Sequence, residues 1–284
     1  MPFRIVQSKQ NARLKELRQA LANPGRNENG SVGIEGPNLL AEAVRAGLHV
    51  RCVFVGQGSE QVLDSIGVPD DVEVLTMPRE LLDSALATET PQPVAALVEP
   101  PDWTWTNMHG DRKEAAPLIV MLAALQDPGN LGTILRSAEA FGADGVLCLP
   151  GTVSEWNPKA VRASAGSVFR MPVLRAKEEE AIAHLREAGV RMLATTVRGA
   201  QPVDLADLSE PVALLIGNEG NGVPVDLAMK ADGAITIPCP GPVESLNAAV
   251  ATSVLLYEAA RQREAARQRA MKSGATLELR GGTR

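Results

Sequence analysis

The chain has 284 residues, 45% of them hydrophobic and 22% charged, and its net charge is −6. This composition excludes a disordered chain and predicts one large domain or two. The longest apolar run is too short to cross a bilayer, and the start, "MPFRIVQSKQNARLKEL", lacks the apolar core of a secretory signal. Cys52, Cys148 and Cys239 lie too far apart for a metal cluster or a disulfide framework. We therefore expect a cytoplasmic protein with no membrane partner and no metal.

The two ends of the chain are basic although the protein as a whole is acidic. Residues 1–26 carry six basic side chains against Glu16 alone, and residues 261–284 carry seven against Glu264 and Glu278. Basic surfaces on an acidic protein can still follow a phosphate backbone, which makes RNA a possible partner. The alternative is that solvated ends simply keep the protein in solution.

The first third of the chain predicts a small α/β domain over residues 1–99. The expected elements are helices at 8–22 and 38–47 and strands at 50–56, 72–77 and 94–100. The stretch "EPPDWTWTNMHGDRKEAAP" that follows is rich in proline and polar residues, so we place a linker at 100–117.

Beyond this linker, short apolar runs alternate with helical patterns. The runs are "LIVMLAAL", "GVLCLP", "VRMLATTV", "VALLIGN" and "AITIP". This pattern predicts a mainly parallel sheet with helices on both faces over residues 118–270, followed by a basic tail at 271–284. Because such sheets bind ligands beyond the carboxyl ends of their strands, functional residues are expected directly after these runs.

The first run is followed by "QDPGNLGTILRSAEAFG", which predicts a helix capped by Asn130 and ended by Gly142. Apolar side chains recur at helical spacing, at Leu131, Ile134, Leu135, Ala138 and Phe141. Arg136 falls off this stripe, so packing does not explain it. The ordinary interpretation makes Asn130 a plain cap and Arg136 one half of a surface ion pair with Glu139 or one of its neighbours.

The fourth run is followed by "GNEGNGVP", in which three glycines surround Glu219. Glycines at this density allow a sharp turn or the close approach of a ligand to the main chain. A dinucleotide-binding fingerprint would be spaced G-x-G-x-x-G and would open a helix, whereas this loop is spaced G-x-x-G-x-G and continues into a proline. The spacing therefore disfavours an ordinary nucleotide-binding enzyme.

The last run is followed by "CPGPVESLNAAVATSVLLYEAARQ", a proline-rich loop and a long helix. Ser245 is the expected N-cap of this helix. Asn247 is an indifferent helix former that no expected turn requires, so its carboxamide is a candidate ligand group.

Together, "DPGNLGTILRSAEAFG", "LLIGNEGNGVP" and "IPCPGPVESLNAAVATSVLLYEA" resemble the motifs of the SpoU (TrmH) family of RNA ribose 2'-O-methyltransferases in the SPOUT superfamily. The resemblance extends through "NPKAVRASAGSVFRMPV", and "SKQNARLKEL" and "IEGPNLLAEA" resemble the family's N-terminal substrate-binding domain. It implies a C-terminal trefoil knot, a homodimer and S-adenosylmethionine as the methyl donor.

The resemblance also implies which residues carry the function. The cofactor-binding candidates are Gly217, Gly222, Ile237, Pro238 and Leu246, and the catalytic candidates are Asn130, Arg136, Glu219, Ser245 and Asn247. The family's arginine is held to activate the 2'-hydroxyl, but a guanidinium stays protonated throughout the physiological range and hardly releases a proton. We therefore expect Arg136 to hold the neighbouring phosphate and stabilise the developing alkoxide.

The leading hypothesis is an RNA 2'-O-methyltransferase that prefers ribosomal RNA to transfer RNA. A second is an RNA-binding or ribosome-assembly protein that keeps the fold without catalysis, which the intact candidate residues disfavour. A third is an ordinary nucleotide-binding α/β enzyme, which the glycine spacing disfavours.

Overall fold

The structure is a computed structural model that describes residues 3–86, 88–109, 116–197, 199–243 and 245–281. Residues 110–115 of the expected linker and 282–284 of the expected tail lie outside the described part. The chain forms two compact units, which are described separately. The first unit comprises Met1–Trp103, Asp127–Arg136 and Val153–Met171, and the second comprises Thr104–Gln126, Ser137–Thr152 and Pro172–Arg284.

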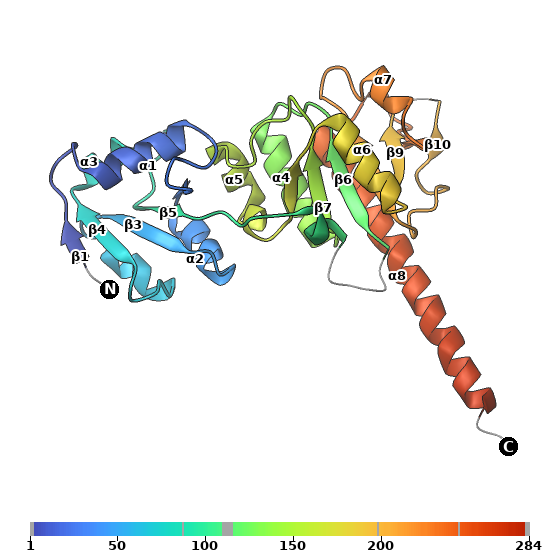
Figure 1. Ribbon diagram of the computed structural model, residues 1–284, viewed down its shortest axis with the longest axis horizontal. Helices are drawn as coiled ribbons and strands as arrows, with labels where there is room; N and C mark the ends of the chain where they lie inside the picture. The colour runs from blue at the N-terminus through green and yellow to red at the C-terminus, as the bar shows by residue number, and fades with distance from the viewer. Residues whose placement is uncertain (1–2, 87, 110–115, 198, 244, 282–284) are drawn as a thin grey trace. The chain divides into compact units, whose positions relative to one another are not determined.

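The first unit is built on a five-stranded mixed sheet with the order β1-β4-β3-β5-β2 (Figure 1). Its strands are β1 (Phe3–Ile5), β2 (Val32–Glu35), β3 (Val50–Gly56), β4 (Glu73–Met77) and β5 (Val94–Val98). β4 pairs in parallel with β1 and β3, whereas β5 runs antiparallel to β3 and β2. The sequence predicted β3, β4 and β5 and missed the two short strands, because β1 has three residues and β2 has four.

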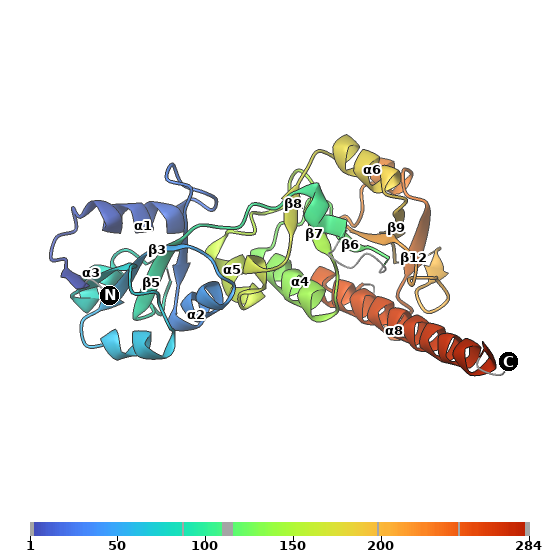
Figure 2. The same cartoon turned by 60° about the horizontal axis from the view of Figure 1, so that its bottom comes forward.

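Helices cover both faces of this sheet. α1 (Ala12–Ala22) and α3 (Arg79–Asp83) bury their apolar side chains against one face, where Phe54, Leu75 and Leu97 are fully covered. α2 (Pro37–Arg45) lies on the opposite side in both views (Figures 1 and 2). The 3-10 helix η1 (Glu60–Ser65) connects β3 and β4.

The second unit contains a seven-stranded sheet with the order β10-β12-β9-β11-β6-β7-β8, in which every pair is parallel. The strands are β6 (Leu118–Leu122), β7 (Gly145–Cys148), β8 (Val173–Arg175), β9 (Arg191–Thr195), β10 (Gln201–Pro202), β11 (Val212–Ile216) and β12 (Gly233–Thr236). The five apolar runs of the sequence all lie in this sheet, which confirms the mainly parallel α/β prediction. The trefoil knot stays a prediction.

Alternate side chains of these strands pack into two layers. Ile119, Met121 and Leu215 belong to one core, which α6 (Glu178–Glu187) and α7 (Val225–Ala228) cover. α8 (Ala248–Gly281) lies on the opposite side of the sheet from α6 (Figure 2). α8 continues without a break through residue 270, where we expected the domain to end. In the part of the chain that the structure describes, no helix combines the length and apolar character needed to cross a membrane.

Arg263 on α8 ties this helix to the edge of the unit. Its guanidinium donates hydrogen bonds to main-chain carbonyls of Leu208 (2.9 Å), Glu210 (2.9 Å) and Pro117 (3.2 Å), and to that of Ala116. Several carbonyls of a loop and of the chain before β6 are thus satisfied by one side chain.

We expect Arg263→Ala to lower the free energy of unfolding by about 2 kcal/mol, because hydrogen bonds to a charged donor contribute more than neutral ones. Urea denaturation followed by circular dichroism measures this change. Arg269→Ala is the matched control, since Arg269 is exposed on the same helix. Equal stability of the two variants would show that Arg263 contributes nothing to the fold.

Candidate active site

The first candidate segment begins α4 (Pro128–Ala140), and Asp127 rather than Asn130 caps this helix. The Asp127 carboxylate accepts the N–H of Asn130 at 2.8 Å, and its carbonyl accepts the N–H of Leu131 at 3.1 Å. The predicted cap at Asn130 is therefore wrong, because an aspartate followed by a proline at the first helical position defines an earlier start. Asn130 lies within the first turn, so capping no longer explains its side chain.

The Asp127 cap is itself held by a cation. Lys159 Nζ lies 3.0 Å from its carboxylate. The hydrogen bond from the Asn130 N–H, followed by that from Lys159, lowers the pKa of Asp127 below its usual value. The carboxylate thus stays charged at neutral pH, and a negative charge at a helix N-terminus is stabilising.

Arg136 lies on the exposed side of α4, as its position off the apolar stripe predicted. Leu131, Ile134, Leu135 and Ala138 are fully buried. Among the described residues, no hydrogen bond or ion pair joins the Arg136 guanidinium, so the predicted alternative of a surface pair with Glu139 is not realised. In an α-helix, positions 130 and 136 lie ~120° apart around the axis and ~9 Å apart along it.

The front of α4 packs tightly on α5 (Pro158–Ser164), which follows in the same unit. A Cβ on Gly132 would lie 2.3 Å from the carbonyl oxygen of Ala160 and 2.6 Å from Cβ of Ala163. Only glycine permits this approach of the two helices. The position of the Arg136 main chain is therefore fixed by backbone contact.

The end of α4 matches the prediction. Gly142 has φ +73°, its N–H donates to the Glu139 carbonyl, and the next N–H, of Ala143, donates to that of Ala138. These two bonds form a Schellman motif, which ends the helix at Ala140.

The second candidate segment forms a closed loop after β11. Asn218 and Gly222 exchange main-chain hydrogen bonds of 3.0 and 2.9 Å, and the Asn218 side chain accepts the N–H of Gly220 at 2.8 Å. A Cβ on Gly217 would lie 1.9 Å from the carbonyl carbon of Gly222. Gly217 is thus required by the fold of the loop, whatever ligand it binds.

This loop is connected to the segment that follows β6, in the same unit. Asn218 Nδ2 donates to the Ala124 carbonyl at 2.8 Å, and the Gln126 N–H approaches Glu219 Oε2 at 3.5 Å. Ala124 has φ +54°, an unusual conformation for a residue with a Cβ. The Glu219 side chain is exposed to solvent at the carboxyl end of the parallel sheet.

The third candidate segment follows β12 and leads into α8. Asn247 caps α8, since its Oδ1 accepts the N–H groups of Ala249 at 2.9 Å and Val250 at 3.3 Å. The predicted N-cap at Ser245 is therefore wrong, and the interpretation that no turn requires Asn247 is wrong as well. Ser245 is exposed in the loop two residues before the cap.

The sheet order brings the cofactor candidates of the second unit to the end of the sheet at which the parallel strands finish. β12, β9 and β11 are neighbours, so Gly217 after β11 and Ile237 and Pro238 after β12 leave the same carboxyl edge. Leu246 is half-buried before α8. No described atom lies within 4 Å of where a Cβ would stand on Gly222, so its main chain borders open space. Among the described residues, no group of three or more metal-ligating side chains occurs.

Sequence reasoning missed two residues that organise these segments, Asp127 and Asn218. An Asp-Pro pair before a helical pattern is a readable N-cap, and it could have identified Asp127. An asparagine two residues before a glycine is a readable turn signal for Asn218, whereas its hydrogen bond to Ala124 cannot be read locally because Ala124 lies far away in the sequence.

Two family models match the chain. The model described as the SpoU rRNA Methylase family matches residues 117–257, and the MRM3-like substrate binding domain matches residues 11–96. Among curated proteins, the chain is 31% identical over 256 residues to the 23S rRNA (guanosine(2553)-2'-O)-methyltransferase RlmP of Bacillus subtilis, covering 89% of this chain and 97% of that one.

Solved structures of similar length match as well. The SpoU methyltransferase AviRb from Streptomyces viridochromogenes, crystallised with AdoMet, has a TM-score of 0.79 at 31% identity over 89% of this chain and 98% of that one. An AdoMet-bound rRNA methyltransferase from Sinorhizobium meliloti has a TM-score of 0.78 at 33% identity, covering 91% of this chain and 98% of that one.

Proposed function

Because this chain belongs to the SpoU rRNA methylase family, we propose that it transfers a methyl group from S-adenosylmethionine to a ribose 2'-hydroxyl of ribosomal RNA. As a member of this family it is an RNA methyltransferase. The observation that supports the donor is the closed glycine loop at the carboxyl edge of the parallel sheet, where open sheets bind their ligands. The relative of Bacillus subtilis supports ribose in ribosomal RNA as the acceptor.

The loops of the second unit suit a cofactor that is held mainly through main-chain groups. Side chains are absent where the chain turns at Gly217, Gly220 and Gly222, and the space beside Gly222 is open. We assign cofactor contacts to Gly217, Gly222, Ile237, Pro238 and Leu246. When bound, S-adenosylmethionine supplies a methyl carbon that is already electrophilic.

The remaining chemistry falls to polar residues of the chain. We assign Arg136 to the phosphate beside the reacting ribose, where its planar guanidinium holds two oxygens and stabilises the developing alkoxide. The 2'-oxygen forms the new bond to the methyl carbon, the carbon–sulfur bond breaks, and the hydroxyl proton passes to a phosphate oxygen or to water. We assign Asn130 and Glu219 to orienting the RNA backbone. Ser245 closes the pocket, and Asn247 fixes the start of the helix behind it.

The test of this function is methyl transfer by the purified protein. Unmodified ribosomal RNA should accept tritiated methyl from S-adenosylmethionine, and mapping should place it on one ribose 2'-oxygen. Transfer to transfer RNA at an equal or higher rate would contradict the preference for ribosomal RNA. Binding of cofactor and RNA without any transfer would favour the alternative of a catalytically inactive assembly protein.

Cofactor binding can be tested separately. We expect calorimetry to show binding of S-adenosylmethionine or S-adenosylhomocysteine without added metal, and NAD at millimolar concentration should not compete. Tight NAD binding together with no heat from either methionine compound would contradict the proposal.

We also propose that the protein is a homodimer and that it acts in the cytoplasm. Val250, Val254 and Tyr257 form an apolar stripe on α8, and 50%, 38% and 58% of their surfaces are exposed. A closed symmetric contact would cover this stripe. Light scattering should give about twice 30.0 kDa. Val250→Asp combined with Val254→Asp should give a monomer, whereas Arg269→Asp on the same helix should not.

A further inference from the structure

The first unit carries a polar groove beside α1 to which the proposed reaction gives no role. The groove has a volume of about 1120 Å³. Asn11, Lys15, Gln19 and Asn23 line it at every fourth position, so they share one side of the helix over ~18 Å. None of the lining residues is aromatic or aliphatic apart from Ala12.

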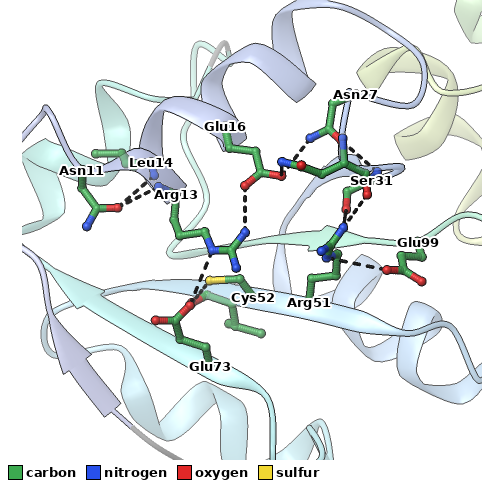
Figure 3. A network of polar contacts seen from close by, with 12 residues as sticks. Asn11, Arg13, Leu14, Glu16, Asn27, Ser31, Arg51, Cys52, Glu73 and Glu99 are labelled. Carbon is green, nitrogen blue, oxygen red and sulfur yellow. Dashed lines mark hydrogen bonds and ion pairs between the residues drawn. The ribbon is translucent and has the colours of Figure 1, made fainter.

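The inner wall of the groove is fixed by Glu16 (Figure 3). One carboxylate oxygen accepts the Nδ2–H groups of Asn27 at 3.0 Å and Asn29 at 2.8 Å, and the other accepts Arg13 at 3.0 Å. Only 12% of the Glu16 side chain is exposed. Although burial acts to raise it, hydrogen bonds from Asn29, Arg13 and Asn27 hold the pKa of Glu16 below its usual value. The wall therefore keeps its charge and its geometry at neutral pH.

Residues 23–31, here called the asparagine loop, contribute Asn23, Arg26, Asn27, Glu28 and Asn29 to the lining of the groove. Asn27 Oδ1 accepts the N–H groups of Asn29 and Ser31, both at 2.9 Å, and the Asn27 N–H donates to the Ser31 carbonyl at 2.8 Å. The Arg51 guanidinium, on β3, donates a hydrogen bond to the Asn29 carbonyl. The loop is polar and glycine-containing, yet its asparagines are held in one arrangement before any ligand binds, which lowers the cost of ordering on binding.

The charges in the groove are mostly satisfied within the protein. Arg13 lies between Glu16 and Glu73, and Arg26 pairs with Asp102 at 2.5 Å. Lys15 is exposed and has no ion pair among the described residues. The groove thus offers Lys15 as a cation without an ion pair. Its asparagine amides are partly used within the protein, because Asn27 Oδ1 accepts two N–H groups and Asn27 and Asn29 each give one Nδ2–H to Glu16.

This combination of groups matches unpaired RNA. Amides can both donate to and accept from the edges of bases, and a single cation matches one phosphate. A duplex bound through its backbone would need a longer series of cations. Sequence-specific RNA recognition uses unpaired bases, because their edges are exposed. Amide side chains can form hydrogen bonds with these edges.

We propose that this groove binds an unpaired segment of the substrate RNA, with Lys15 on a phosphate and with the exposed amides of Gln19 and Asn29 on base edges. Glu16 is a positioning residue, because it acts through Asn27 and Asn29. The inference rests on the proposed function, since the RNA is the substrate of that reaction.

The direct test compares Lys15→Gln combined with Gln19→Ala against Lys9→Gln in the full chain. Lys9 is exposed just before α1 and does not line the groove, so it controls for loss of one positive charge. With unmodified 23S rRNA transcript as the probe, we expect the double variant to bind about tenfold more weakly, and Lys9→Gln to bind within about twofold of wild type. The single-turnover rate at saturating RNA and the affinity for S-adenosylmethionine should not change.

Glu16→Gln tests positioning, because the substitution keeps the size of the side chain but replaces an acceptor by a donor. We expect a higher KM for the 23S transcript with an unchanged kcat, and a weaker preference for it over a 16S transcript. A purely structural role would lower the melting temperature and leave this preference unchanged, which would overturn the assignment of Glu16.

Photocrosslinking gives a result that does not depend on catalysis. Wild-type protein irradiated with 4-thiouridine-labelled 23S transcript should yield crosslinked peptides from residues 11–29. Normal RNA binding by the double variant, or crosslinks confined to other segments, would overturn the proposal that this groove binds RNA. The groove would then have to bind a different class of partner. If wild type binds the transcript and the groove variants do not, but no methyl is transferred, the proposed function fails and the groove stands.

Discussion

Replacing Arg136 with alanine is expected to slow methyl transfer by about 100-fold or more, the scale of removing one preorganised donor. Arg136 is exposed on α4, and the buried stripe of that helix does not include it. The variant should therefore keep its melting temperature and its affinity for S-adenosylmethionine. Single-turnover methylation at saturating RNA measures the chemical step without the contribution of RNA binding.

Three further variants test the assignment of Arg136 more closely. Arg136→Lys keeps the charge but loses the planar fork, so we expect a loss close to that of alanine. Glu139→Gln is the control for a simple surface role, and it should transfer methyl at nearly the normal rate. Asn130→Ala should be impaired less than Arg136→Ala. A normal rate for Arg136→Ala would show that this arginine is only a surface residue of α4.

Replacing Gly217 with alanine is expected to open the loop after β11. The added Cβ would lie 1.9 Å from the carbonyl carbon of Gly222 and 2.1 Å from the nitrogen of Val223, and both are main-chain atoms that cannot rotate away. We expect at least a tenfold loss of affinity for S-adenosylmethionine in calorimetry and about 1–3 kcal/mol lower stability, the usual scale of overpacking.

Gly220 offers a matched control for stability in the same loop. The nearest atom to a Cβ on Gly220 is Asn218 Oδ1 at 3.5 Å, which is an ordinary contact. Gly220→Ala should therefore unfold at nearly the wild-type denaturant concentration. If Gly217→Ala were as stable as Gly220→Ala and bound the cofactor normally, neither cofactor binding nor stability would depend on the closed form of the loop.

Much of the parallel sheet of the second unit, and of α4, follows from local pattern. Continuous apolar runs predicted its strands, the helical stripe from Leu131 to Ala138 predicted the buried side of α4, and Gly142 predicted its end. The resemblance to the SpoU family, carried by the three motifs, is confirmed by the family model and the relatives. These features are readable because hydrophobic periodicity and the left-handed preference of glycine act within a few residues.

Helix starts were harder to predict than helix ends. Asp127 and Asn130 compete for one cap, and Ser245 and Asn247 compete for another. All four residues are of types that cap helices well, so intrinsic preference cannot choose between them. The choice depends on where the chain leaves the preceding strand and turn, which is set by the packing of the whole unit.

The sequence by itself determined the α/β class with its mainly parallel sheet and the family, and it predicted Arg136 and Gly217 as candidate site residues. Only the tertiary structure decided what surrounds them: the closure of the glycine loop on Ala124, the backbone contact of Gly132 with α5, and the polar wall that Glu16 builds with Asn29. The physical reason is the separation along the chain over which each kind of interaction acts. Periodicity and turn preference act between near neighbours in the chain, whereas these contacts join residues that only folding brings within hydrogen-bonding distance.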